Sequence, residues 1–308
     1  MTNRILVIGG GGFIGQHVIR AFLAEGIPVS VLDVAAPQQD EHAIHWVTGS
    51  IADATLVASA ATNCDTVVFL ANSSLPGSSH ADLSAEVEAH VQTTVKVAEI
   101  CDRVGVRRFV FASSGGTVYG YEPDGGVALH EEMPTRPRNA YGASKLAIEH
   151  YLRLLGDTRE IATVSLRISN PYGEGQRAVR AQGVIAAAMQ HTMAGTQMPI
   201  WGDGSVERDF IHVADVARAF VLATTHPRPE GLMNIGSGTS ASLREIVGLV
   251  EASLGRPLRV DYQRERKIDV KRNVLDISRA RDSLGWAPQI ELAEGIARTA
   301  AWWRMQQG

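Results

Sequence analysis

The stretch that most constrains the fold covers residues 5–15 and reads ILVIGGGGFIG. A short apolar run breaks into four consecutive glycines, and apolar residues at helical spacing follow, so the pattern predicts a buried strand, a tight turn and a helix. Glycines without a Cβ let backbone N–H groups approach a pyrophosphate at the start of that helix. The predicted phosphate-binding residues are Gly9, Gly12, Phe13, Ile14 and Gly15. A glycine-rich turn is also found in ordinary strand-to-helix connections, so other residues must decide between the two interpretations.

Bulk composition is that of an ordinary globular protein. The 308 residues are 45% hydrophobic and 20% charged, enough to bury the core of one large or two modest domains. A formal net charge of −4 gives no general attraction to nucleic acid or to an anionic membrane. No apolar run reaches the roughly 18 residues that a membrane span needs. Arg supplies 25 of the 29 basic residues and is the better bidentate ligand for phosphate.

Cys64 and Cys101 are the two cysteines. They are widely spaced and fit no metal-ligand pattern, so we expect free thiols, a reducing compartment and no metal site. The N-terminus enters a strand without a basic region or a cleavage site. A cytoplasmic location is therefore expected.

The first half of the chain alternates apolar runs with helical periodicity. Strands are expected at residues 4–8, 29–32, 44–48, 66–70, 108–112 and 163–168, and helices at residues 13–25, 86–104 and 141–155. Gly26 is expected to end the first helix, and Asn139 is expected to cap the start of the third. The alternation predicts an α/β fold with a doubly wound parallel sheet of the Rossmann type.

The alternation loosens after Pro171. Helices are expected around residues 183–193, 213–225 and 243–254, with a strand at 232–235 and a terminal helix through Trp302 and Trp303. We expect residues 1–170, joined by 206–240, to form the dinucleotide-binding domain. Residues 171–205 and 241–308 are expected to form a smaller substrate-binding lobe over the strand ends.

Asp33 ends the second expected strand, where a carboxylate can accept hydrogen bonds from a ribose diol. It would repel a 2′-phosphate, and no Arg or Lys follows it through Asp40, so NAD is favoured over NADP as cofactor. Other residues at strand ends complete the predicted cofactor site: Ser50, Ile51, Leu70, Ala71, Asn72, Ser113 and Ile168.

The stretch Tyr141-Gly-Ala-Ser-Lys145 carries the predicted chemistry. Tyrosine and lysine at i and i+4 share one face of a helix, which places the ammonium near the phenol and should lower its pKa. For the phenol to be half ionised near pH 7, its pKa must fall by about three units from about 10, which corresponds to roughly 4 kcal/mol. Lys145 and a positive nicotinamide ring, in a site from which water is excluded, would supply this free energy. Tyr141 would then move a proton while NAD moves a hydride.

These residues together resemble the extended short-chain dehydrogenase/reductases of the nucleotide-sugar epimerase/dehydratase family, most closely the UDP-glucose 4-epimerases. The resemblance covers nearly the whole chain. Its motifs are the glycine turn, SSGGTVYG at residues 113–120, Tyr141 with Lys145, LRISNPYG at 166–173, GDG at 202–204, RDFIHV at 208–213 and LGW at 284–286. Five or more motifs in the same order make coincidence improbable.

The resemblance implies a pocket for a nucleoside-diphosphate sugar, and the expected ligand is a UDP-sugar. Asn170, Arg208 and Arg266 match diphosphate-binding positions, and Trp201 matches a residue that borders the base. Two Arg forks and an amide would neutralise a diphosphate that an acidic protein otherwise repels. The resemblance also implies a homodimer formed through the helices at 86–104 and 141–155.

Several positions depart from the family pattern. The family's catalytic Ser or Thr falls on Gly115, so Thr117, our preferred candidate, or Ser114 must replace its hydroxyl. Gly116 and Thr117 stand where sugar 4,6-dehydratases carry an acidic pair, which argues against water elimination. A pocket Asn is replaced by His90, and a Tyr that narrows the sugar pocket is replaced by Asn273, which would admit a larger sugar.

The sequence thus predicts an NAD-dependent nucleotide-sugar epimerase acting at carbon 4 of a UDP-hexose through a 4-keto intermediate. One alternative is an NAD(P)H-dependent reductase of a nucleotide-linked 4-keto sugar, which uses the same Tyr and Lys. A more remote alternative is a non-catalytic dinucleotide-sensing protein, against which the intact Tyr141 and Lys145 speak.

Overall fold

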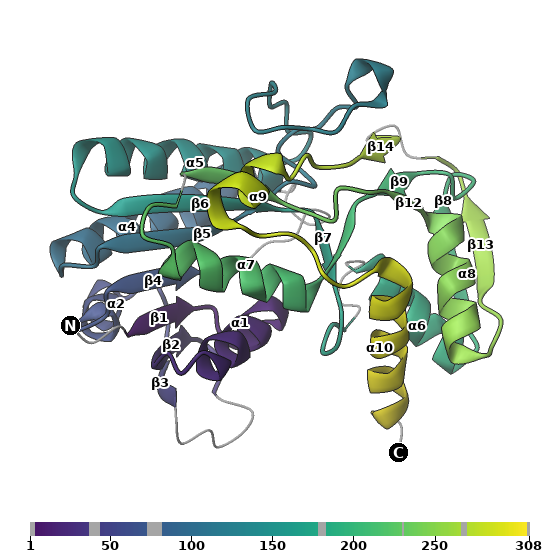
Figure 1. Cartoon of the computed structure of the whole chain (residues 1–308), viewed down its shortest axis with the longest axis horizontal. Coiled ribbons are helices and arrows are strands. Elements are labelled where there is room, and N and C mark those ends of the chain that lie inside the picture. Colours follow the sequence, from purple (N-terminus) through teal and green to yellow (C-terminus); the bar gives the residue numbers. More distant parts are fainter. Residues whose placement is uncertain are drawn as a thin grey trace.

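A seven-stranded parallel sheet forms the centre of the molecule (Figure 1). The structure, a computed structural model, describes residues 4–36, 44–72, 82–177, 183–229, 231–265 and 270–306. The strand order is β11-β6-β5-β4-β1-β2-β3, and every neighbouring pair is parallel. The strands are β1 (Ile5–Ile8), β2 (Val29–Asp33), β3 (Ile44–Thr48), β4 (Thr66–Phe69), β5 (Arg108–Ser114), β6 (Ala162–Ile168) and β11 (Leu232–Ile235). The predicted doubly wound parallel sheet is confirmed.

Helices cover both faces of this sheet, which is why its central strands β1, β2 and β4 are largely apolar and buried. One face packs on α1 (Phe13–Ala24) and α7 (Val213–Thr225), and the other on α2 (Ala54–Ala61), α4 (Thr93–Arg103) and α5 (Ala140–Thr158) (Figure 1). Successive side chains of β1 alternate between the two cores, with Ile5 and Val7 in one and Leu6 and Ile8 in the other.

The caps expected for two helices are present. Gly26, just after α1, has a left-handed φ of 68°. The Asn139 side chain accepts a hydrogen bond of 2.7 Å from the backbone N–H of Gly142 and begins α5. The helix expected at residues 86–104 is less regular: α3 (Leu83–Glu86) continues into a π-helical turn, η1 (Val87–Gln92), before α4. Such π turns widen a helix locally and are frequent at functional sites.

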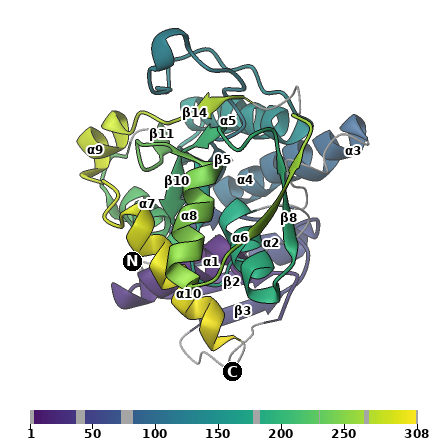
Figure 2. The same cartoon turned by 90° about the vertical axis from the view of Figure 1, so that its right-hand side faces the viewer.

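A second group of elements lies beyond the carboxyl ends of the strands, on the right of Figure 1 and facing the viewer in Figure 2. Its core joins α6 (Val184–Ala194), α8 (Leu243–Leu254) and α10 (Leu292–Met305). Beside them, β8 (Gln197–Trp201) pairs with β13 (Arg259–Gln263). The remaining short strands are β7 (Asn170–Tyr172) with β10 (Phe210–His212), and β9 (Glu207–Arg208) between β12 (Ala241–Ser242) and β14 (Arg272–Asn273). A 3₁₀ turn, η2, covers Asp124–Gly126.

The last third of the chain contributes to both groups. Leu275, Trp286 and α9 (Ser278–Leu284) belong to the core around the sheet, although they lie in the stretch 241–308 expected for the smaller lobe. The division into two lobes itself stays a prediction. Among the described residues, no helix combines the length and apolar character that crossing a membrane requires.

Candidate functional site

The glycine turn after β1 is too close to its neighbours to hold side chains. A Cβ at Gly9, which has a φ of 85°, would lie 2.6 Å from the backbone N of Ala71. A Cβ at Gly15 would lie 2.5 Å from the carbonyl oxygen of Gly9. Gly12, at the N-cap of α1, has no atom nearer than 3.5 Å to such a Cβ, so space remains in front of the helix N-terminus. This cradle fits a dinucleotide pyrophosphate, which binds at glycine-rich helix N-termini.

Asp33 lies beside the turn at the end of β2. Its carboxylate accepts hydrogen bonds from the backbone N–H of Gly11 at 2.8 Å and of Ala35 at 2.9 Å. β1 and β4 are neighbours although the chain does not connect them directly, so the strand order reverses there. Ligands of doubly wound sheets bind at that reversal, and residues 70–72, at the end of β4, lie at it.

The other predicted cofactor residues differ in their surroundings. The Ser50 hydroxyl accepts a hydrogen bond of 3.2 Å from the N–H of Ala52, and Ile51 packs on the core beneath the sheet. The Ser113 side chain is buried, and its hydroxyl donates to Glu149 of α5. Their contact with a cofactor stays a prediction.

Tyr141 and Lys145 lie on the first two turns of α5, against the end of β5. The buried Lys145 ammonium donates to the carbonyl oxygen of Ala112 at 2.8 Å and lies 5.5 Å from the centre of the Tyr141 ring. Burial raises the pKa of Tyr141 to about 12, and a hydrogen bond with Ser114 opposes this rise. Burial lowers the pKa of Lys145 to about 8, opposed by the charges of Glu149 and Glu86. The predicted lowering of the Tyr141 pKa by Lys145 is therefore not found in the protein alone, because the cost of burying the phenolate is larger.

The position of the missing hydroxyl is filled. A Cβ at Gly115 would lie 2.5 Å from Leu275 Cδ1 and 3.0 Å from the carbonyl oxygen of Arg167. Ser114 is hydrogen-bonded to Tyr141, whereas the Thr117 hydroxyl is buried without a hydrogen-bond partner among the described residues. The geometry thus favours Ser114 over Thr117, which we preferred from the sequence.

Two predicted substrate residues lie beside the loop at residues 115–117. Asn170 on β7 donates to the carbonyl oxygen of Asp209 at 2.8 Å, and its side chain is 3.7 Å from where a Cβ on Gly116 would be. The buried Asn273 donates to the carbonyl oxygen of Gly115 at 3.3 Å, and its Oδ1 has no partner among the described residues.

The other predicted substrate residues are less closely gathered. Arg208 is next to Asn273 in the ladder of β9 and β14 and donates to the carbonyl oxygens of Glu207 and Val270 at 2.8 and 2.7 Å. Trp201 ends β8 in the smaller group of elements. Arg266 lies outside the described residues.

A buried carboxylate near Tyr141 and Lys145, that of Glu86, was not assigned a role from the sequence, which singled out only its neighbour His90. Glu86 and His90, one turn apart on α3 and η1, are both buried and lie 3.8 Å apart, a contact that becomes an ion pair when His90 is protonated. Burial lowers the pKa of His90, which the charge of Glu86 opposes and that of Lys145 favours. Their i, i+4 spacing is a sequence signal, but similar pairs line many exposed helices.

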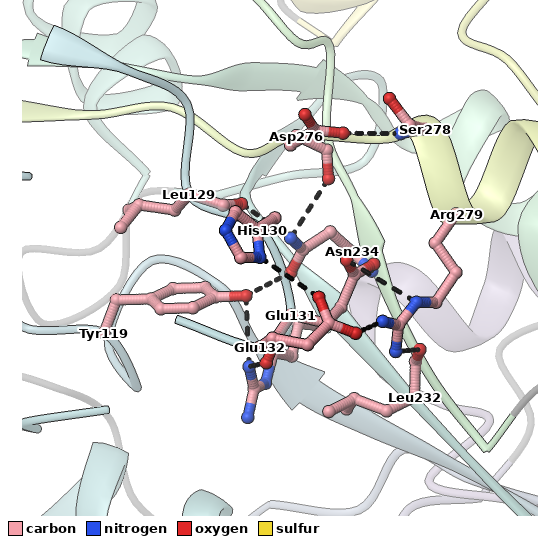
Figure 3. Close-up of polar contacts among 11 residues, drawn as sticks. Tyr119, Leu129, His130, Glu131, Glu132, Leu232, Asn234, Asp276, Ser278 and Arg279 are labelled. Carbon is pink, nitrogen blue, oxygen red and sulfur yellow. Dashed lines mark hydrogen bonds and ion pairs between the residues drawn. The ribbon is translucent and has the colours of Figure 1, made fainter. Parts of the chain in front are cut away.

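A network of polar groups joins β11 and α9 to the segments that follow β5 (Figure 3). The Tyr119 hydroxyl donates to Asn234 at 2.8 Å, and the N–H of Asn234 donates to Glu131 at 2.7 Å. Arg279 of α9 pairs with Glu131 at 3.8 Å. Tyr119 belongs to the motif at 113–120. Its hydrogen bond to Asn234 therefore holds in place the loop that carries Gly115 and Thr117.

Comparison with known proteins supports these observations. Residues 5–236 match the family described as the NAD dependent epimerase/dehydratase family. The chain is 34% identical to a UDP-glucose 4-epimerase of Mycolicibacterium smegmatis over 98% of both chains. It is 31% identical to a dTDP-4-dehydro-6-deoxyglucose reductase of Escherichia coli, over 96% of this chain and 95% of the other. The structure is similar to that of Thermus thermophilus UDP-glucose 4-epimerase in complex with NAD, with a TM-score of 0.89, 32% identity and coverage of 98% and 99%.

Proposed function

Since the chain belongs to the NAD dependent epimerase/dehydratase family, we propose that it is an NAD-dependent epimerase acting at carbon 4 of a UDP-hexose. The observation that carries the proposal is the arrangement of Tyr141, Ser114 and the buried Lys145 at the end of β5, on the same edge of the sheet as the glycine cradle after β1 and separated from it by β4. Relatives named as UDP-glucose 4-epimerases, similar over almost the full chain, support the choice of reaction and of UDP.

The cofactor would be held by the glycine turn, with Asp33 on the adenosine ribose and Lys145 on the nicotinamide ribose. When bound, NAD would supply a reversible hydride acceptor for carbon 4 and a positive charge that favours the ionised phenol. The cradle at Gly9 and Gly15, where a Cβ cannot fit, matches the close approach that a pyrophosphate needs.

Tyr141 would remove the proton of the sugar's 4-hydroxyl and later return it. Its phenol is protonated at neutral pH in the protein alone, because burial holds its pKa at about 12. Ionisation in the complex therefore depends on positive charge nearby, and Lys145 supplies such a charge below about pH 8. Ser114 donates to the phenolate or to the sugar oxygen and takes the part of the absent hydroxyl at Gly115.

Asn170, Arg208 and Arg266 would bind the diphosphate, with Trp201 beside the base. Arg208 donates from Nη1 to two carbonyl oxygens, and the planar guanidinium fork of an arginine matches the geometry of phosphate oxygens. Asn273 borders the sugar beside Gly115, where its Oδ1, which has no partner within the described parts of the chain, is available to a hydroxyl.

Purified protein tests this proposal directly. It should interconvert UDP-glucose and UDP-galactose, or their N-acetyl forms, without net consumption of cofactor, and Tyr141→Phe should lose at least about a hundredfold in kcat. If no pair of sugars is interconverted and Tyr141→Phe leaves the remaining activity unchanged, the proposal is wrong.

A reductase of a nucleotide-linked 4-keto sugar is the second candidate, favoured by the similarity to the Escherichia coli dTDP-4-dehydro-6-deoxyglucose reductase. It would use the same tyrosine and lysine but release oxidised cofactor in each turnover. Stoichiometric consumption of NADH or NADPH with a 4-keto sugar would establish it. Asp33 argues mildly against it, since a carboxylate repels the 2′-phosphate of NADPH.

We also propose a homodimer formed through the helices at residues 86–104 and 141–155, which correspond to α3, η1 and α4 and to α5. Large apolar side chains on these neighbouring helices are more than half exposed: Leu83, Val87, Tyr151 and Leu154. Monomeric proteins rarely leave such apolar groups together on the surface. Leu154→Glu should convert the dimer to a monomer in analytical ultracentrifugation, and an unchanged mass would exclude this interface.

A cytoplasmic location is proposed from the cysteine chemistry. Cys64 and Cys101 are free and buried. Burial raises the pKa of Cys64 to about 11 and that of Cys101 to about 12, so both thiols stay protonated and unreactive.

A further inference from the structure

The end of β5 and one face of α5 contact each other at three consecutive strand residues. The pairs are Ala112 with Lys145, Ser113 with Glu149, and Ser114 with Tyr141. The helix residues follow one another at intervals of four, so they lie on one stripe of α5 that faces the strand. The alignment of α5 along β5 that places Glu149 therefore also places both proposed catalytic side chains against the strand.

Glu149 is held more firmly than either of them. Arg167, the cross-strand neighbour of Ser113 on β6, donates to the two carboxylate oxygens of Glu149 at 3.0 Å from Nε and 2.7 Å from the terminal nitrogen. Both side chains are about 95% buried. The same guanidinium donates to the Tyr119 hydroxyl at 3.0 Å, so the pair is anchored to the buried network of Figure 3. An ion pair with this geometry resists displacement, because moving either partner leaves a buried charge uncompensated.

We propose that Glu149 is a positioning residue for the reaction, which locks the register of α5 on β5 and so places Tyr141 and Lys145 relative to Ser114. The inference rests on the proposed function, because it assigns Glu149 to the geometry of that proton transfer. A fixed alignment of α5 on β5 determines the positions of the reacting groups on the first turns of α5. It does not affect Asn170 or Arg208, which lie on β7 and β9.

The carboxylate also acts on Lys145 by its charge. The groups that face the Lys145 ammonium are Glu149 and Tyr141 on α5, Glu86 on α3 and His90 on η1. The charge of Glu149 favours the protonated amine against the cost of burial. Position and charge can be separated, because aspartate keeps the charge and shortens the side chain by one methylene.

The first experiment compares kcat and KM of Ser113→Ala and Glu149→Asp with those of Ser237→Ala. Ser237 is the matched control, since its hydroxyl likewise donates to a buried carboxylate, Asp209, at 2.9 Å, but away from α5. Loosening the register should lower kcat by about tenfold with KM within about twofold, since small misplacements of reacting groups are costly. If both variants keep the kcat of the wild type and of Ser237→Ala while only their melting temperatures fall, the proposal is wrong.

The second experiment follows Lys145 without using activity. The chain has four lysines, so ¹³Cε NMR resolves them, and Lys145→Met assigns the signal. Glu149→Gln should lower the pKa of Lys145, whereas Glu149→Asp should keep it, and an unchanged titration in Glu149→Gln contradicts the charge effect. This readout holds even if the wild type epimerises no UDP-hexose, in which case the proposed function fails separately. Should Glu149→Gln not fold because Arg167 loses its partner, Ser113→Ala, which removes no charge, decides the outcome.

Discussion

Replacing Gly115 with serine would restore the hydroxyl that the family pattern has there, and we predict that it destabilises the protein and does not raise kcat. The new Cβ would lie 2.5 Å from Leu275 Cδ1, whereas carbon atoms in contact prefer about 3.5–4.0 Å. Leu275 is fully buried, and the second close atom, the carbonyl oxygen of Arg167 at 3.0 Å, belongs to the backbone of β6. Leu275 would have to withdraw by about 1 Å and the carbonyl oxygen by a few tenths of an ångström, and both movements disturb the core, a strain that costs about 1–3 kcal/mol.

Gly116→Ser is the matched control for this prediction. Neither glycine has a positive φ, and a Cβ at Gly116 meets nothing nearer than Asn170 Oδ1 at 3.7 Å. Thermal unfolding should therefore place Gly115→Ser roughly 2–10 °C below Gly116→Ser, the shift that about 1–3 kcal/mol produces in a chain of this size. Combining Gly115→Ser with Leu275→Ala should cost less than the sum of the single changes, because the alanine removes the clash. Equal melting temperatures for the two serine variants, or a higher kcat for Gly115→Ser, would refute the reasoning.

Three further predictions concern the cofactor turn and the acid stability. Gly15→Ala should weaken NAD binding by at least about tenfold in calorimetry, since its Cβ would lie 2.5 Å from the Gly9 carbonyl oxygen and force the turn open. Asp33→Asn should lower the preference for NAD over NADP, measured as the ratio of the two dissociation constants, because it removes the charge that repels a 2′-phosphate. Glu174 has its pKa lowered from 4.5 to about 2, chiefly by a hydrogen bond with His212, so it stabilises the fold above about pH 4.5 and ceases to do so as pH falls toward 2. Glu174→Gln should therefore remove about 1–2 kcal/mol of stability at neutral pH, allowing for partial exposure, and flatten the acid limb of the unfolding curve.

The sheet could be predicted because each strand carries its own signal. Strands buried on both faces are continuous apolar runs, and the helices between them repeat every three to four residues, so both appear in short windows of sequence. The π-helical turn η1 could not be predicted, since helical periodicity across residues 86–104 gives no sign of one extra residue in a turn.

The site was predictable where a motif is local and not where it depends on distant contacts. The glycine turn with Asp33, and Tyr141 with Lys145, each follow from spacing along the chain, and the structure places each set together. The direction of the Tyr141 pKa was predicted wrongly for the protein alone, because a neighbouring charge is visible in a sequence and the depth of burial is not.

The absence of a hydroxyl at Gly115 follows from how the chain closes over this loop. Leu275 fills the space that a side chain there would take, and Asn273, two residues earlier, donates to the Gly115 carbonyl oxygen. A side chain at position 115 and this packing of residues 273–275 therefore exclude each other. In the proposed reaction Ser114 replaces this hydroxyl, because it ends β5, which contacts α5 through the hydrogen bond from Ser113 to Glu149. A hydrogen-bond donor at the end of a strand that is held in place loses less conformational entropy than a donor on a loop. Using the hydroxyl of Ser114 in place of one at position 115 therefore preserves the geometry around Tyr141.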